Sequence, residues 1–247
     1  YFNKNIKNFR ISNQKQKIDL LKNFNVDFVI TKKFNKEFSK TKSDDFIKKI
    51  LVKKLNAKFI FVSNNFRFGN KREGNVKQLI KNENLFNYKI VKPKPLLIKK
   101  KIVSSSLIRS YLQKGKLREA NKLLNRNWSI QGNVQKGKQI GKKIGFPTAN
   151  IDIKDTILAR PGVYAVKAKI HKSEKYFKGI ANLGYRPTFN GKKILLEVHL
   201  FNFYRNLYDK YLTVKFLKFI RKEIKFKNAD QLKKQIKKDL LVAKKAK

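Results

Sequence analysis

The sequence predicts two domains, a parallel α/β domain followed by a six-stranded antiparallel β-barrel that ends in a helix. Three observations support this prediction. The chain has 247 residues, which is long for a single ordinary domain. Strand and helix patterns alternate up to about Leu124, whereas short strand patterns without intervening helices begin at Trp128. We therefore divide the chain into residues 1–124 and 125–247.

The first domain has the pattern of βαβ units. Its strand, helix, strand, loop, helix and strand are expected at residues 26–31, 43–55, 58–62, 63–74, 76–80 and 88–91. Ser43 is expected to cap the first of these helices. Parallel connection of such units gives a doubly wound sheet that binds its ligand beyond the carboxyl ends of the strands. A further helix, over residues 110–127, leads to the domain boundary.

The second domain is rich in short alternating or aromatic runs that glycine and proline interrupt. Six strands are expected, at residues 128–134, 149–153, 163–170, 177–183, 195–203 and 211–220. Asn228 and Gln231 then form a capping-box arrangement ahead of a helix with one apolar face. We expect this last helix to pack against the barrel.

The charge of the chain supports a different interpretation. Its 62 Lys and Arg against 16 Asp and Glu give a net charge of +46, which suits binding to nucleic-acid phosphates. The excess is mostly Lys, is spread evenly along the chain and accompanies abundant Asn, Ile and Phe, a pattern that coding bias in an AT-rich genome also produces. A basic nucleic-acid-binding protein with a β-barrel is therefore the alternative, and nucleic acid is not the expected partner.

Several classes of protein are excluded by composition. No run approaches the roughly 20 apolar residues of a membrane helix, and no signal-peptide pattern follows Tyr1. The absence of cysteine excludes disulfides and thiolate metal sites, and two histidines are too few for a histidine-rich site. We expect a cytoplasmic protein without a membrane partner, in which any metal is held by oxygen atoms. The oligomeric state is not predicted.

A glycine-rich segment precedes the second barrel strand. Its glycines could let the main chain approach phosphate oxygens while Lys142 supplies charge, although hairpin turns use glycine as well. The segment ends in Phe-Pro-Thr-Ala-Asn at residues 146–150. Thr148 and Asn150 are two residues apart at the start of a strand, so they point to the same side. Two neutral oxygens there could hold Mg²⁺ beside nucleotide phosphates.

A carboxylate lies in the middle of a predicted barrel strand. Strict alternation places Glu197 on one face with Leu195, His199 and Phe201. A carboxylate between apolar neighbours could accept a proton from a hydroxyl group. The alternative is a residue that simply faces solvent from the barrel, and for His199 we expect a packed or hydrogen-bonded neighbour.

These segments together resemble one family of enzymes. The segments at residues 137–151, 161–164, 181–189, 196–199 and 220–226 are similar, in order and spacing, to bacterial riboflavin kinases. The resemblance covers residues 128–247. It implies a six-stranded Greek-key barrel that phosphorylates riboflavin to FMN, with ATP as co-substrate and Mg²⁺ as cofactor.

The resemblance also implies roles for single residues. Thr148 and Asn150 would bind the Mg²⁺–ATP phosphates, and Gly137 and Lys142 would line the nucleotide loop. Glu197 would be the base for the ribityl 5′-hydroxyl. Arg221 would border the flavin site.

Upstream, the chain resembles the FMN adenylyltransferase domain to which bacterial riboflavin kinases are commonly fused, a nucleotidyltransferase of Rossmann-like fold. Residues 64–74, with Asn65 and Phe66, look like its flavin-side loop. Residues 103–109, with Ser104, Ser105 and Arg109, resemble its nucleotide-binding signature. Serines that open a helix can meet phosphates with hydroxyl and free N–H groups, whereas the alternative for them is simple N-capping.

One motif of that domain is missing from the chain. The family carries a His-x-Gly-His motif after an early strand, whereas both histidines here, His171 and His199, lie in the kinase half. Tyr1 aligns downstream of the missing segment. We therefore expect a complete kinase joined to an adenylyltransferase domain that lacks its first βα unit, and conversion of FMN to FAD is in doubt.

Overall fold

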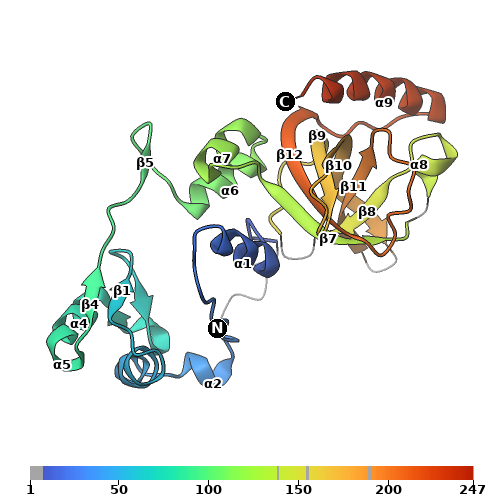
Figure 1. Cartoon of the computed structure of the whole chain (residues 1–247). Helices are drawn as coiled ribbons and strands as arrows, with labels where there is room; N and C mark the ends of the chain where they lie inside the picture. The colour runs from blue at the N-terminus through green and yellow to red at the C-terminus, as the bar shows by residue number, and fades with distance from the viewer. Residues whose placement is uncertain (1–7, 138, 154–155, 189–190, 247) are drawn as a thin grey trace. The chain divides into compact units, whose positions relative to one another are not determined.

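The computed structural model describes residues 8–246 except 138, 154–155 and 189–190, so Tyr1 and Phe189 lie outside the described residues (Figure 1). Two compact units make up this part of the chain. Unit 1 is Phe28–Ile102, and unit 2 combines residues 8–27 with residues 103–246. Compactness does not show where a catalytic domain begins, so the division into residues 1–124 and 125–247 stays a prediction.

Unit 2 contains the barrel that the sequence predicts. Its six strands are β7 (Ser129–Gln135), β8 (Ala149–Asp152), β9 (Gly162–Ile170), β10 (Phe177–Thr188), β11 (Gly191–Leu200) and β12 (Tyr211–Arg221). They close in the order β10-β11-β8-β7-β12-β9, and each pair is antiparallel. The connections from β8 to β9 and from β11 to β12 skip neighbouring strands, as in a Greek key. The predicted antiparallel barrel is confirmed.

Alternation along the strands separates the barrel core from its outer face. Leu183, Leu196, Leu212 and Phe216 point inward and are fully buried. Their sequence neighbours point outward, because successive side chains of a strand alternate between its faces. Every second residue of β8, β10 and β11 is therefore available for a site outside the barrel.

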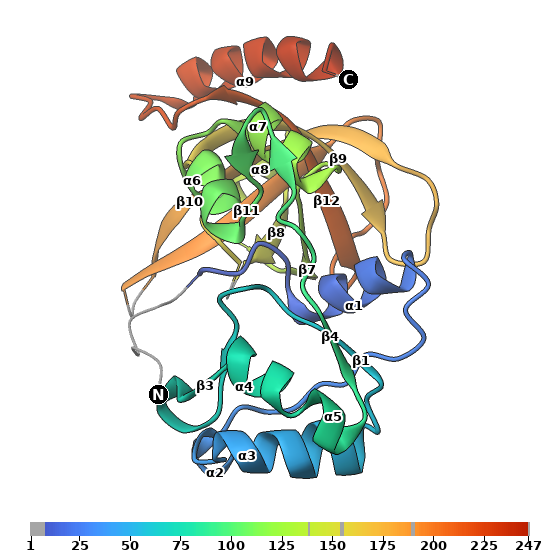
Figure 2. The same ribbon diagram turned by 90° about the vertical axis from the view of Figure 1, so that its left-hand side faces the viewer.

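The C-terminal helix α9 (Ala229–Lys244) covers part of this outer face, against β9, β10 and β12 (Figures 1 and 2). Asn228 caps it by accepting a hydrogen bond from the Gln231 N–H at 3.0 Å, as predicted. The Gln231 side chain accepts from the Lys227 N–H, one residue earlier than a capping box requires. Ala243 of the helix is buried against Ala165 and Ile180 of the barrel.

Unit 2 also contains the helices α1 (Gln14–Lys22), α6 (Ser105–Gln113) and α7 (Leu117–Leu124). The single helix predicted over residues 110–127 is wrong, because Gly115 adopts a positive φ of 73° and separates α6 from α7. Between β7 and β8 lies the short helix α8 (Ile140–Lys143). The Trp128 indole N–H donates to the Ile11 carbonyl at 2.9 Å, which ties the segment before α1 to the barrel.

Unit 1 is a small α/β unit. Its elements are α2 (Lys36–Ser39), α3 (Ser43–Asp45), the π-helix η1 (Phe46–Lys54), β1 (Phe59–Phe61), β2 (Arg67–Phe68), the 3₁₀ helix η2 (Asn70–Arg72), β3 (Gly74–Asn75), α4 (Val76–Lys81), α5 (Glu83–Phe86), β4 (Lys89–Val91), β5 (Leu97–Ile98) and β6 (Lys101–Ile102). Strands β1 and β4 pair in parallel, and helices lie between them in the sequence. This arrangement confirms the βαβ pattern.

Unit 1 differs from the prediction in several details. The segment 63–74, expected as a loop, contains β2, η2 and the start of β3, and β2 and β3 pair antiparallel. Residues 26–31 are not a strand, because an apolar run becomes a strand only where a neighbouring strand takes its hydrogen bonds, and Phe28 and Ile30 are exposed instead. Ser43 is the first helical residue rather than the cap. Its N–H donates to the Glu73 carboxylate at 2.7 Å, so a distant residue caps this helix.

In the part of the chain that the structure describes, no helix is both long and apolar enough to span a membrane.

Candidate active site

A cavity of about 380 Å³ lies on the outer face of the barrel, next to α9. Thr148, Glu197 and Arg221 all line it, so three residues predicted from separate segments come together. Strands β9, β10 and β11 supply one wall, and apolar residues of α9 supply another. Glu197 faces outward from the barrel, as the alternative for it anticipated, but into this cavity.

Strand register places three polar residues in a row on the outer face of the barrel, of which Glu197 and Asn182 line the cavity and Asn150 does not. Glu197 of β11 lies directly opposite Asn150 of β8 and, on its other side, opposite Asn182 of β10. Directly opposed residues of antiparallel strands share a face of the sheet. The Asn182 Oδ1 atom is buried and has no hydrogen-bond partner among the described residues. A buried acceptor without a partner is costly, so a donor from a bound molecule or water would satisfy it.

The glycine-rich segment packs against this row. A side chain at Gly137 would collide with the Asn150 amide nitrogen, and one at Gly141 would collide with the Phe146 carbonyl. At Gly141 the obstacle is backbone, so glycine is required there, whereas a side chain at Gly137 would have to displace the Asn150 amide.

A second cavity, of about 480 Å³, lies on the other side of the Phe-Pro-Thr segment. Lys142, Pro147 and Thr148 line it together with residues 203–208. Thr148 lines both cavities. The two spaces thus meet at the hydroxyl-bearing residue that the sequence predicts as a metal ligand.

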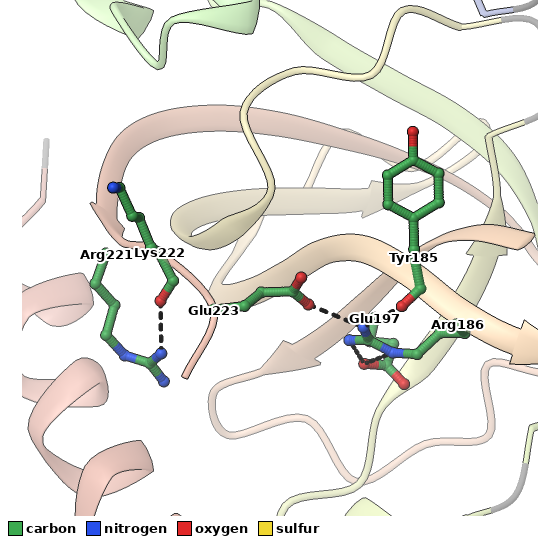
Figure 3. A network of polar contacts seen from close by, with 6 residues as sticks. All are labelled: Tyr185, Arg186, Glu197, Arg221, Lys222 and Glu223. Carbon is green, nitrogen blue, oxygen red and sulfur yellow. Dashed lines mark hydrogen bonds and ion pairs between the residues drawn. The ribbon is translucent and has the colours of Figure 1, made fainter. Parts of the chain in front are cut away.

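The expectation that Glu197 lies between apolar neighbours is wrong. Its Oε2 accepts two hydrogen bonds from Arg186, at 2.6 Å from Nη2 and 3.2 Å from Nε. Arg186 Nη1 donates to Glu223 Oε1 and to the Tyr185 carbonyl, each at 2.9 Å. Figure 3 shows one guanidinium to which both carboxylates point.

This network determines the ionisation of Arg186. Burial alone would lower the pKa of Arg186, but hydrogen bonds and charge from Glu197 and Glu223 outweigh burial and raise the pKa. Arg186 is therefore a cation in this network, as an arginine is throughout the neutral range.

Arg221 lines the cavity but directs its guanidinium to α9. It donates to both oxygens of Asp239, with Nη2 2.7 Å from Oδ2. Asp239 is 2% exposed, and Gln235 donates to its Oδ1 as well. The main contact of Arg221 is therefore a buried ion pair between β12 and α9, and its flavin-site role stays a prediction. His199 is hydrogen-bonded to the Pro147 carbonyl at 2.9 Å, as predicted.

The candidate residues of the first domain are divided between the two units. In unit 1, Asn65 accepts from the Ser63 hydroxyl at 2.9 Å, and the Phe66 ring stacks on Phe68. In unit 2, Ser104 caps α6 by accepting from Leu107 N–H at 3.3 Å, which is the N-capping alternative. Ser105 is exposed in the first turn of α6, and Arg109 Nε donates to the Phe9 carbonyl at 2.9 Å. Their binding roles stay predictions.

Sequence reasoning missed four polar residues of the main cavity, Asn182, Arg186, Glu223 and Asp239. Alternation puts Asn182 and Arg186 on one face of their strand, which was a usable signal. The sequence does not show the register between β10 and β11, which brings this face of β10 beside Glu197. Glu223 follows the last strand and contacts Arg186 of β10, whereas Asp239 reaches the cavity through the packing of α9.

A closed barrel with a carboxylate-lined outer cavity, beside a glycine-rich loop and a second cavity, is an arrangement typical of an enzyme that acts on small molecules. Comparison with known proteins identifies the class. The riboflavin kinase family matches residues 124–247, and the FAD synthetase family matches residues 1–107.

Two relatives are named bifunctional riboflavin kinase/FMN adenylyltransferase. The protein from Buchnera aphidicola subsp. Schizaphis graminum is 44% identical over 239 residues, which are 96% of this chain and 76% of the relative. The Haemophilus influenzae protein is 40% identical over 95% of this chain and 76% of its own length. A crystal structure of a macrolide-efflux protein from Streptococcus pneumoniae superposes with a TM-score of 0.81 at 29% identity, over 95% of this chain and 75% of that one. The chain belongs to the bifunctional riboflavin kinase/FMN adenylyltransferase family.

Proposed function

We propose that unit 2 is a riboflavin kinase, which transfers the terminal phosphoryl group of ATP to riboflavin and gives FMN and ADP. Membership of the family supports the reaction, and the riboflavin kinase match spans the whole barrel and α9. The nucleic-acid alternative has no such support from the relatives.

One observation carries the assignment of roles: Glu197 lies opposite Asn150 and shares a cavity with Thr148, which also lines the second cavity. Riboflavin would occupy the cavity of Glu197, and ATP would occupy the cavity of Lys142. The acceptor hydroxyl and the transferred phosphoryl group would then meet at Thr148. Phosphoryl transfer depends mainly on such alignment and on neutralising charge.

A divalent metal fits the residues at this meeting point. Among the described residues, no group of three or more His, Asp or Glu side chains could hold a metal unaided. Mg²⁺ needs few protein ligands, because it keeps several waters and takes phosphate oxygens. Thr148 and Asn150 would supply neutral oxygens, because they lie two residues apart at the start of β8 and point to the same side. When bound, Mg²⁺ neutralises charge on the phosphates.

The second activity of the family is adenylyl transfer from ATP to FMN, which forms FAD and pyrophosphate. We assign Asn65 and Phe66 to its flavin side, and Ser104, Ser105 and Arg109 to its nucleotide side, on the resemblance of their segments. The same assay that detects FMN would detect FAD.

The kinase assignment is tested by incubating the purified chain with riboflavin, ATP and Mg²⁺. FMN should form, and Glu197→Gln should lower the rate by about a hundredfold or more, as expected for loss of a general base. Glu174→Gln is the matched control, because the Glu174 side chain is 93% exposed and remote from the cavity lining. Salt-sensitive binding to nucleic acid without any FMN formation would instead favour the alternative.

A further inference from the structure

Arg186 is held on several sides inside the proposed active site. Its Nη1 is anchored by Glu223 and by its neighbour's carbonyl, while Nε and Nη2 both donate to Glu197. The side chain is 25% exposed, and those of Glu197 and Glu223 are 29% and 38% exposed. A guanidinium that donates in several directions at once has little freedom to turn, because its N–H groups form a rigid plane.

A glycine makes this arrangement possible. Asn182, Gly184 and Arg186 lie on the same face of β10, and Glu197 is paired with Asn182. Arg186 must therefore reach back along the strand past Gly184 to contact Glu197. A side chain at Gly184 would lie 2.7 Å from Glu223 Cδ, so the missing side chain leaves the space that the second carboxylate occupies.

Both contacts from Arg186 fall on one oxygen of Glu197. Oε2 takes the two hydrogen bonds, and in the described part of the chain no hydrogen bond reaches Oε1. The two oxygens of the carboxylate are thus distinguished by their surroundings. One is fixed to the barrel, and the other is left to accept a proton from a ligand.

We propose that Arg186 is a positioning residue that holds Glu197 by Oε2 and so presents Oε1 to the hydroxyl that is phosphorylated. The proposal rests on the proposed function, because it assigns Arg186 a role through the base of that reaction. Without the guanidinium, Glu197 and Glu223 would repel each other and Glu197 would turn away. A shift of about 1 Å in a catalytic group can cost a hundredfold in rate.

Arg186→Met tests this role, because methionine keeps much of the aliphatic stem and removes the guanidinium. We expect kcat to fall by about tenfold or more, while KM for riboflavin changes less than about threefold, because the acceptor is bound but not aligned. Arg118→Gln, at an exposed position of α7, is the matched control and should keep the wild-type rate.

The decisive measurement is a double-mutant cycle with Glu197→Gln. If Arg186 acts through Glu197, Arg186→Met should lower the rate of the Glu197→Gln enzyme by less than about twofold. An equal loss in both backgrounds would overturn the proposal, and so would a wild-type rate for Arg186→Met. If the wild-type chain forms no FMN, the proposed function fails together with this proposal. If it forms FMN but the cycle shows equal losses, only the role of Arg186 fails.

Gly184→Ala perturbs the same network without removing a charge. Its methyl group should displace Glu223 and loosen Arg186. We expect kcat to fall in the wild-type background and to stay unchanged in the Glu197→Gln background. This variant decides the question if Arg186→Met proves unstable by thermal unfolding, and equal losses in both backgrounds would count against the proposal.

Discussion

At the scale of the residue, Thr148 is the point at which the two cavities of the barrel meet. The Phe-Pro-Thr segment, with Gly141 behind it, holds this side chain between a space lined by Lys142 and a space lined by Glu197. Thr148 therefore lies where we propose that the two substrates meet.

Thr148→Ala should mainly raise the Mg²⁺ and ATP concentrations that the kinase requires, because it removes one of the proposed oxygen ligands. Initial rates measured across Mg²⁺ and ATP titrations check this expectation. Thr148→Ser, which keeps the hydroxyl, should behave as wild type. An unchanged Mg²⁺ requirement in the alanine variant would remove Thr148 from the metal site.

The residue scale also shows why sequence alone found Glu197 but not its partner. Alternation fixed the face on which Glu197 lies. Arg186 is eleven positions earlier in the chain, and its contact depends on the register of two strands and on the absence of a side chain at Gly184. Neither can be read from local pattern.

At the scale of the element, α9 forms one wall of the main cavity. Asp239 is almost completely buried on this helix and pairs with Arg221 at the end of β12. Lys178 of β10 donates to the carbonyl of Lys244, the last residue of the helix, and to that of Ala246 beyond it. The helix is thus fixed to the barrel by charged contacts as well as by its apolar face.

Asp239→Ala should destabilise unit 2 by about 3 kcal/mol or more, because it leaves the Arg221 charge buried without its partner. Urea unfolding followed by Trp128 fluorescence would measure the loss. Asp230→Ala is the control, since Asp230 is exposed in the first turn of the same helix and should cost less than about 1 kcal/mol. Equal losses for the two variants would show that the buried pair adds nothing.

The elements also differ in how far the sequence predicted them. The barrel strands and the cap of α9 follow from alternation and from a local side-chain hydrogen bond. The break between α6 and α7 depends on the positive φ of Gly115, and the start of α3 depends on Glu73, thirty positions away. Both boundaries are set by tertiary contacts, and the helix propensities of the neighbouring residues carry no information about such contacts.

At the scale of the whole molecule, the two units have cores of very different size. In the described residues of unit 1, the core cluster is Ile47, Phe68, Leu79 and Tyr88, and the parallel sheet has two strands. The core of unit 2 fills the closed barrel and extends to α6 and α7. Two-stranded sheets are marginal by themselves, so unit 1 should be the less stable.

Urea should therefore unfold the chain in two steps. Trp128 is the single tryptophan, is fully buried and lies 4.6 Å from the Phe216 ring, so its fluorescence reports on unit 2 alone. Circular dichroism of the helices should begin to change at a lower urea concentration than this fluorescence. Coincident transitions would show instead that the two units unfold together.

The sequence by itself determined the kind of protein. Period-two alternation gave the barrel, strand and helix order gave the βαβ pattern, and ordered motifs gave the family, because each of these is encoded in neighbouring residues. Only the tertiary structure decided the site. The pairing of Glu197 with Asn150, the clamp of Arg186 on two carboxylates and the cavity beneath α9 join residues far apart in the chain, and such contacts exist only once strand register and helix packing are fixed.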